Sequence, residues 1–276
     1  MTFKALQMAQ VRRAEQERGR AAWKAVLGVG LRTLAAAAVS AALSLGAWQG
    51  WRWATQSQAF TIREIRFSGL VHAQEADLLS RSGLKRGANL FGADLGRAAR
   101  AVQTHPWVAS ATLARRLPGE VLATIVEHRP AALVQLGGLY VLDEEGRLFK
   151  RAAPEDGLDL PVVTGISREA WAEQKPELQL RLFGALHLLD TWRASGFPVA
   201  SVSEVRIDED GGFTLFAHDG TAVQEVRLGS SDISLKLRRL AQIRAALARR
   251  GERAAKIDLD NPARPDQAAA TLADKR

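Results

Sequence analysis

Residues 107–127, WVASATLARRLPGEVLATIVE, carry two runs of strand-forming residues on either side of a Leu117-Pro118-Gly119 turn. In the second run, Val121, Ala123 and Ile125 share one face, because successive side chains of a strand point to opposite sides. Proline and glycine between the runs favour a tight turn. The stretch therefore predicts two antiparallel strands, Trp107–Leu117 and Glu120–Glu127.

Three elements before this hairpin complete a small module. The segment after Asp94 repeats apolar residues at i, i+3, i+4 and i+7, which indicates a helix with one apolar face. A shorter helix is predicted over Gln74–Arg81, and the apolar pattern of Phe60–Phe67 is typical of a strand. The order β-α-α-β-β over residues 60–130 predicts a three-stranded sheet covered on one face by two helices.

The chain after Pro130 is dominated by short predicted strands. Two long helices interrupt them, over Glu177–Ser195 and from Ser231-Asp232 onward, each with an apolar stripe. The predicted strands are Leu139–Leu142, Arg147–Phe149, Pro161–Thr164, Val202–Asp208, Phe213–Ala217, Ala222–Leu228, Ala255–Leu259 and Gln267–Leu272. Residues 131–276 therefore form a second, strand-rich domain in this interpretation, and the fold class is α+β.

An apolar stretch, Ala25–Trp48, precedes both modules and contains one charge, Arg32. As a helix it would be about 36 Å long, enough for a hydrocarbon core of about 30 Å. Tryptophans lie on both sides of it, as they do at membrane interfaces: Trp23, Trp48, Trp51 and Trp53. Residues 25–53 are therefore predicted to be a transmembrane anchor with an aromatic belt. A cleaved signal peptide and a soluble alanine-rich helix are the alternatives.

The net charge of +8 is concentrated near this stretch. Residues 1–53 carry eight basic and two acidic side chains, which leaves a net charge of only +2 for the rest of the chain. A nucleic-acid-binding domain would carry the excess on its folded part, so no nucleic-acid partner is expected. The positive-inside rule instead predicts that residues 1–24 are a cytoplasmic basic tail and that the two modules lie outside the cytoplasm.

No catalytic or metal-binding motif is recognisable in the sequence. The chain has no cysteine, and its five histidines include no pair at the HExxH spacing of zinc hydrolases. A GxSxG elbow and a P-loop are also absent. Acidic clusters at residues 143–145 and 208–210 are expected to be solvated turns, with a weak divalent-cation site as the alternative. We therefore expect no enzyme activity, no cofactor and no small-molecule substrate.

A basic helix is predicted near the C-terminus. Its cations are Lys236, Arg238, Arg239, Arg244, Arg249, Arg250 and Arg253. Such a charge run is usually a solvated face, and a docking face for an acidic partner is the alternative.

Several motifs, in this order along the chain, resemble those of the FtsQ/DivIB family of bacterial division proteins. They are FTIREIRFSG (60–69), NLF (89–91), HPWV (105–108), RRLPG (115–119), IVEHRPAA (125–132), YVLDEEG (140–146) and LG (228–229). The module over residues 60–130 is similar to an FtsQ-type POTRA domain, and residues 131–276 are similar to the β domain of the family.

The resemblance implies a non-enzymatic, single-pass protein of the bacterial inner membrane, with periplasmic modules, at the division septum. It implies the partners FtsB and FtsL and other division proteins, bound partly by strand addition at the last strand. The partner-binding residues it suggests are Lys236, Arg239, Gln267, Ala268, Ala269, Ala270, Thr271 and Leu272. The alternative functions are a POTRA-containing factor for outer-membrane protein assembly or secretion, and a wall enzyme without a recognisable motif.

Overall fold

The computed structural model describes residues 32–273, except residues 221, 262 and 265–266. Within it the chain divides into two compact units. Unit 1 comprises residues 1–66, 84–94 and 114–122, and unit 2 comprises residues 67–83, 95–113 and 123–276. A three-stranded sheet of order β1-β3-β2 contributes residues to both units. Its strands are β1 (Glu64–Ser68), β2 (Val108–Arg116) and β3 (Glu120–Glu127).

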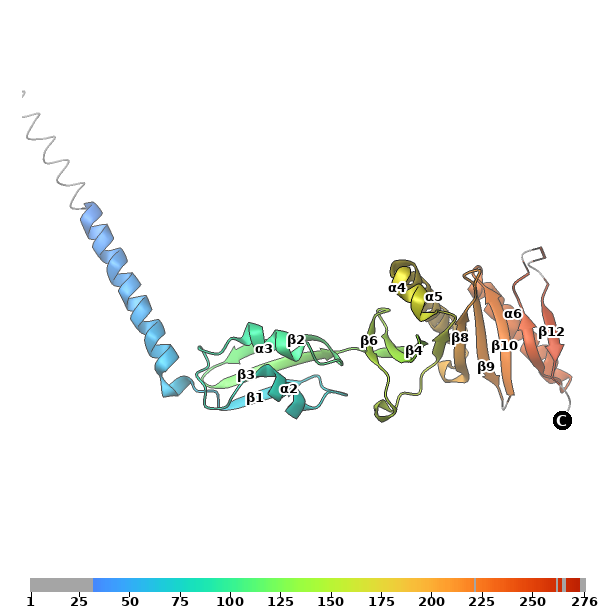
Figure 1. The fold of residues 1–276 in the computed structure, drawn as a ribbon, viewed down its shortest axis with the longest axis horizontal. Helices are drawn as coiled ribbons and strands as arrows, with labels where there is room; N and C mark the ends of the chain where they lie inside the picture. The colour runs from blue at the N-terminus through green and yellow to red at the C-terminus, as the bar shows by residue number, and fades with distance from the viewer. Residues whose placement is uncertain (1–31, 221, 262, 265–266, 274–276) are drawn as a thin grey trace, which may run out of the picture. The chain divides into compact units, whose positions relative to one another are not determined.

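Unit 1 contains a long N-terminal helix over described residues 32–56, drawn in blue in Figure 1. No helix in the part of the chain that the structure describes combines the length and the apolar character that crossing a bilayer requires. The predicted tail 1–24, Trp23 and the first part of the predicted anchor lie outside the described residues.

The sequence motifs of unit 1 hold the end of this helix and the adjacent loop. The Asn89 side-chain amide donates hydrogen bonds to the carbonyls of Ala54 (3.0 Å) and Ser57 (3.3 Å). The Arg115 guanidinium donates to the carbonyls of Leu90 (2.9 Å) and Ala93 (2.6 Å). These side chains satisfy backbone acceptors that no regular ladder satisfies, which explains why asparagine and arginine occur there.

The first predicted strand is shorter than expected. Phe60–Phe67 was expected to be continuous, but β1 starts at Glu64. Residues before it pair with another segment, because the Ile62 N–H donates to the Ala88 carbonyl and the Leu90 N–H donates to the Phe60 carbonyl. The backbone therefore changes its pairing partner at Arg63-Glu64, where β1 begins.

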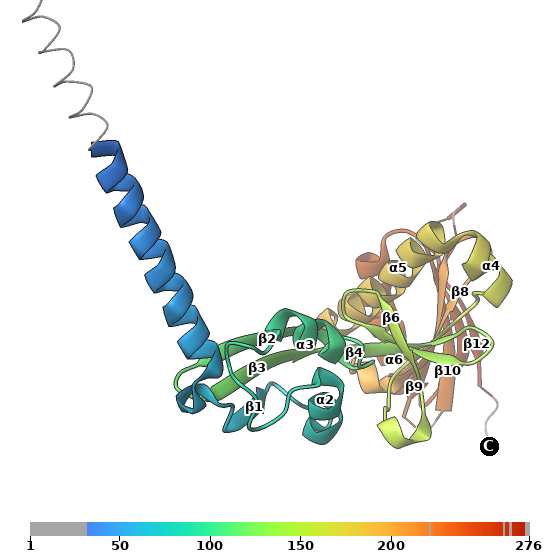
Figure 2. The same ribbon diagram turned by 60° about the vertical axis from the view of Figure 1, so that its left-hand side comes forward.

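In unit 2, helices α2 (Glu75–Ser82) and α3 (Leu95–Val102) pack on one face of the small sheet. Leu78 and Val102 are fully buried against Ala123 and Ile125 of β3. The β-α-α-β-β module predicted from the sequence is therefore present, with the two helices on the expected single face (Figure 2).

The rest of unit 2 is a nine-stranded sheet of order β12-β11-β10-β9-β8-β7-β4-β5-β6. Its strands are β4 (Pro130–Gln135), β5 (Leu139–Asp143), β6 (Leu148–Arg151), β7 (Val162–Thr164), β8 (Val202–Ile207), β9 (Phe213–Asp219), β10 (Ala222–Gly229), β11 (Ala254–Asp258) and β12 (Ala269–Leu272). Strand β7 runs parallel to β4 and β8, and β10 runs parallel to β11, while the other neighbours are antiparallel.

The two long predicted helices supply the core that covers this sheet. Helix α5 (Lys175–Ala194) buries Leu182 and Trp192, and helix α6 (Ile233–Arg249) buries Leu237 and Leu240. These side chains belong to one apolar cluster with the inward residues of the strands. The mixed helix and strand content agrees with the predicted α+β class.

One strand and one α-helix of the second module were not predicted. Strand β4 starts at Pro130, a residue whose type and position indicated only a domain boundary. Proline is permitted at the first residue of a strand, so it did not prevent pairing with β5 and β7. Helix α4 (Arg168–Glu173) has only six residues and buries none of them, so it leaves no periodic apolar signal.

Candidate interaction edge and domain joint

Strand β12 forms one end of the nine-stranded sheet, shown in red in Figure 1. Among the described residues, β11 is its only strand neighbour, with Ala270 opposite Ile257. All four residues of β12 are exposed. An edge strand presents unpaired backbone donors and acceptors, which another chain can use.

One hydrogen bond shows which backbone N–H groups of β12 point toward the open edge. The Ala273 N–H donates to the Arg253 carbonyl on the β11 side (2.9 Å). The register shift in this pair lies on β11, so the alternation along β12 is regular. Because N–H groups of an antiparallel strand alternate in direction, those of Ala270 and Leu272 point toward the open edge.

A buried lysine holds the segment that leads into this strand. The Lys236 ammonium on α6 donates to the Leu228 carbonyl (2.7 Å) and to the Asp260 carboxylate (3.0 Å). Gly229 has a φ of +63°, and an added Cβ would lie 2.2 Å from the Asp260 carboxylate. The Leu228-Gly229 motif therefore leaves room for the carboxylate that Lys236 binds.

The predicted partner-binding residues fall into two groups. The first group is the segment 267–272. Gln267 and Ala268 are exposed just before β12, and the strand itself consists of Ala269, Ala270, Thr271 and Leu272. Lys236 is only 7% exposed, and Arg239 is half-buried on the same helix. The structure therefore assembles a continuous exposed segment over residues 267–272, with Lys236 beneath its approach and not on its surface.

The basic helix is less solvated than either interpretation of its sequence assumed. Besides Lys236, Arg244 turns inward, where its Nε donates to the Gln224 side chain (2.9 Å). Its guanidinium carbon lies 5.5 Å from the Trp192 ring and 5.3 Å from the Phe197 ring. Burial lowers the pKa of Arg244 from its ordinary value. Lys236 and Arg244 therefore have structural roles inside the domain.

A stack of rings in unit 2 joins the end of the small module to strand β6. His72 stacks on Trp107 with ring centres 3.9 Å apart, and Phe149 lies 5.3 Å from Trp107. His128 stacks on Phe149 at 4.5 Å. Trp107 is 6% exposed and is therefore a core aromatic residue.

Two buried carboxylates hold the segments around this stack. Burial raises the pKa of Glu127, but the N–H groups of residues 71–73 and the His72 ring donate to the carboxylate and bring the pKa below its ordinary value. Burial likewise raises the pKa of Asp143, and hydrogen bonds from the Arg147 N–H, the His128 ring and the Arg147 guanidinium lower it overall.

Asp143 corrects one sequence-based expectation. The acidic cluster at residues 143–145 was expected to be a solvated turn, but Asp143 is fully buried and only Glu144 and Glu145 are exposed. The other cluster binds its own turn, since Asp210 accepts from the Gly212 N–H and pairs with Arg227. Within the described residues, no group of three histidine or acidic side chains is arranged to hold a metal ion.

The described tryptophans of the predicted anchor lie on the N-terminal helix, where Trp48, Trp51 and Trp53 are exposed. Trp51 makes an edge contact with Phe91 (6.3 Å), and Trp53 makes one with Phe60 (5.7 Å). Arg32 is the first described residue of this helix. Within unit 1, the aromatic group thus ties the end of the helix to the loop at residues 89–91.

Comparison with known proteins identifies both modules. Residues 60–128 match the model of the FtsQ-type POTRA domain, and residues 132–260 match the C-terminal model of cell division protein FtsQ/DivIB. Cell division protein FtsQ of Anaeromyxobacter sp. (strain K) is 47% identical over 86% of this chain and 80% of its own length. This chain belongs to the FtsQ/DivIB family.

Other FtsQ/DivIB relatives agree. Cell division protein FtsQ of Myxococcus fulvus is 40% identical over 87% of this chain and 85% of its own length. That of Geobacter sp. (strain M21) is 30% identical over 91% of each chain. The predicted family and POTRA type are therefore confirmed, and neither matched model describes a catalytic domain. The match to the FtsQ/DivIB C-terminal model ends at residue 260, before β12.

Proposed function

We propose that this protein is a non-enzymatic scaffold of the cell division machinery that binds FtsB and FtsL in the periplasm, partly by strand addition at β12. Through this complex it would assemble and regulate septal wall synthesis. The observation that carries the proposal is the open, fully exposed edge of β12 in a division-family chain. Main-chain hydrogen bonds supply affinity in this binding mode, so the small alanine side chains of the strand do not prevent it.

The roles of the proposed binding residues differ. Residues 269–272 offer the strand edge, and Gln267 and Ala268 flank it. Arg239 is a candidate side-chain contact on the neighbouring helix. We assign Lys236 a positioning role, since its ammonium holds Asp260 and the segment that leads to β12.

Replacing Ala270 by proline tests the strand-addition step. Proline removes the N–H that points to the open edge but leaves the bonds from β12 to β11 in place. One lost backbone hydrogen bond and the proline ring should reduce co-purification of FtsB at least about fivefold. Ala270→Val is the matched control, since valine keeps the N–H and favours a strand. Unchanged capture of FtsB by the proline variant would contradict the assignment of this edge.

We also propose a retained transmembrane anchor over residues 25–53, with residues 1–24 in the cytoplasm and the modules periplasmic. The basic tail, the apolar stretch and the flanking tryptophans support this topology. The chain has no cysteine, so a single introduced cysteine is a unique probe.

In cells with a permeabilised outer membrane, a membrane-impermeant maleimide should label Ala200→Cys. Thr2→Cys should react only after lysis. The opposite pattern, or release of the mature protein into the soluble fraction, would reject the anchor. A fluorescent fusion should concentrate at midcell, whereas an even distribution would argue against a septal role.

A further inference from the structure

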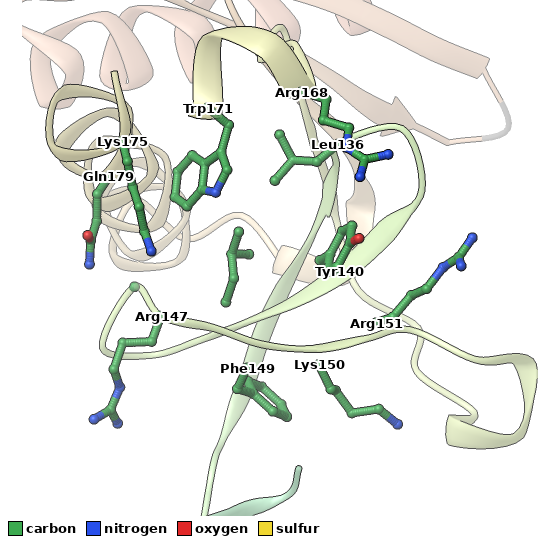
Figure 3. A pocket seen from close by; sticks show the side chains of 12 residues that line it. Leu136, Tyr140, Arg147, Phe149, Lys150, Arg151, Arg168, Trp171, Lys175 and Gln179 are labelled. Carbon is green, nitrogen blue, oxygen red and sulfur yellow. The ribbon is translucent and has the colours of Figure 1, made fainter. Parts of the chain in front are cut away.

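A cavity of about 540 Å³ lies between the β5–β6 hairpin and the first turns of α4 and α5, entirely within unit 2 (Figure 3). Its lining includes five cations and no carboxylate. In Figure 3, Lys175 lies on one side of the opening, Arg151 and Arg168 lie on the other, and Trp171 lies between Lys175 and Arg168. This site is unrelated to β12, which forms the other end of the sheet.

Three of the five cations have no acidic partner among the described residues. Arg147 pairs with Asp143 and Glu145, and Lys150 pairs with Asp156. Among the residues that the structure describes, no carboxylate lies within ion-pair distance of the other three, which are Arg151, Arg168 and Lys175. Their charges are therefore available to a ligand.

The two arginines converge on one tight turn. An added Cβ would lie 3.6 Å from Arg168 Cδ at Gly137 and 3.3 Å from Arg151 Nη2 at Gly138. Arg168 therefore lies against Gly137 and Arg151 lies against Gly138, in the loop that joins β4 to β5. A bound anion lowers the repulsion between like charges that border one loop.

The floor of the cavity is apolar and aromatic. Leu136 is buried, Trp171 and Tyr140 are half-buried, and the Lys175 ammonium lies 5.9 Å from the centre of the Trp171 ring. Phe149 and Lys150 point to the opposite side of β6 in Figure 3. A ligand with an apolar side chain between negative charges would match this arrangement.

Strand β6 adds an open backbone edge. It ends the nine-stranded sheet, and β5 is its only strand neighbour among the described residues. Charged side chains on an edge strand discourage pairing with a second copy of the same strand. Arg151 is exposed at the end of β6 and has this effect, but the same charge favours an acidic strand.

We propose that this cavity and the β6 edge bind an extended acidic peptide segment of a partner protein, with an apolar side chain over Trp171 and carboxylates on Arg151, Arg168 and Lys175. A planar guanidinium group can donate two parallel hydrogen bonds to a carboxylate or to a phosphate, so the arginines alone do not distinguish these ligands. The apolar floor and the open strand edge favour a peptide, since an isolated phosphate group uses neither. The protein then has a second docking surface, independent of the one at β12.

The test uses the full-length chain in nanodiscs of phosphatidylcholine. The probe is a fluorescein-labelled nine-residue peptide of alternating glutamate and valine with a central phenylalanine. An identical peptide with glutamine in place of glutamate is its control. Fluorescence anisotropy should show at least tenfold tighter binding of the glutamate peptide.

The double variant Arg151→Glu/Arg168→Glu should lose at least tenfold in affinity for this peptide. The matched control is Arg193→Glu, which changes an exposed arginine of α5 whose partner is Asp190. It should stay within about twofold of the parent. A peptide with lysine in place of glutamate should bind the double variant better than the parent, which a merely misfolded variant would not do.

Three results would overturn the proposal. The first is equal binding of the glutamate and glutamine peptides, and the second is unchanged binding by the double variant. The third is binding of phosphatidylglycerol vesicles or inorganic phosphate that depends on Arg151 and Arg168 while the glutamate peptide does not bind. That outcome would assign the cations to a phosphate group.

Discussion

At the scale of single residues, two glycines of the sequence motifs are explained by a neighbouring group that leaves no space for a side chain. Gly119 is such a case, since an added Cβ would lie 2.4 Å from the Thr61 carbonyl oxygen. Gly229 is another, because the Asp260 carboxylate occupies the space where a side chain would be. A glycine at these positions reflects lack of space as much as backbone conformation.

Replacing Gly229 by alanine should therefore destabilise the protein. The left-handed φ and the clash with Asp260 together should cost roughly 1–3 kcal/mol. Thermal unfolding of the full chain measures the loss. Gly196→Ala is the matched control, because Gly196 has a φ of +87° but nothing within 4 Å of an added Cβ. A loss at Gly229 no larger than that at Gly196 would show that the contact with Asp260 has little effect.

The buried carboxylates Glu127 and Asp143 predict acid sensitivity. Both have a folded-state pKa below the ordinary values of 4.5 and 3.8. Their stabilisation is complete above the unfolded-state pKa and is lost as pH falls through the folded-state pKa. The melting temperature should therefore fall steeply below about pH 4.5.

The variants Glu127→Gln and Asp143→Asn should each be less stable at pH 7 and should lose less stability on acidification than the parent. Thermal unfolding between pH 7 and pH 3 measures both effects. An acid-induced loss of the same size in parent and variants would show that other groups cause the sensitivity.

At the scale of elements, the position of β12 depends on contacts outside the strand. Its residues are exposed and alanine-rich, so burial and intrinsic propensity contribute little. The Lys236–Asp260 contact and the parallel pairing of β10 with β11 bring the segment to the sheet.

Lys236→Met tests this positioning role. Methionine keeps the apolar part of the side chain but cannot bind Asp260 or the Leu228 carbonyl, at a cost of about 1–3 kcal/mol. Amide hydrogen exchange should become faster over residues 254–272, and capture of FtsB should weaken. Arg238→Met is the control on the exposed face of the same helix. Weakened capture without faster exchange would instead indicate a direct contact by Lys236.

Most elements were predictable because their signals are local. The apolar stripes of α5 and α6 and the alternation of β8 to β10 appear within one element each. Strand β4 was missed because proline at its first residue was interpreted as a boundary. The burial of Lys236 and Arg244 could not be predicted, because a basic helix has the same sequence whether its cations face solvent or a partner in the interior of the domain.

At the scale of the whole sheet, the candidate surfaces lie at its two ends. Eight strand intervals separate β6 from β12, which corresponds to about 38 Å at about 4.8 Å per interval. Sites this far apart, without shared contacts, are expected to act independently.

Arg151→Glu/Arg168→Glu should therefore leave capture of FtsB unchanged within about twofold, and Ala270→Pro should leave binding of the glutamate peptide unchanged. Combining all three substitutions should give additive losses within about 0.5 kcal/mol. Strong coupling between the two measurements would show that the sheet transmits a conformational change or that one partner contacts both ends.

The order of most elements and the family were predictable from the sequence alone, because periodicity, turn residues and motif spacing are encoded locally along the chain. Tertiary structure decided which strands have an open edge, which cations are buried, and that Arg168 and Arg151 border the same loop at Gly137 and Gly138. These properties depend on pairing and packing between residues far apart in sequence, and a linear pattern of residue types does not contain that information.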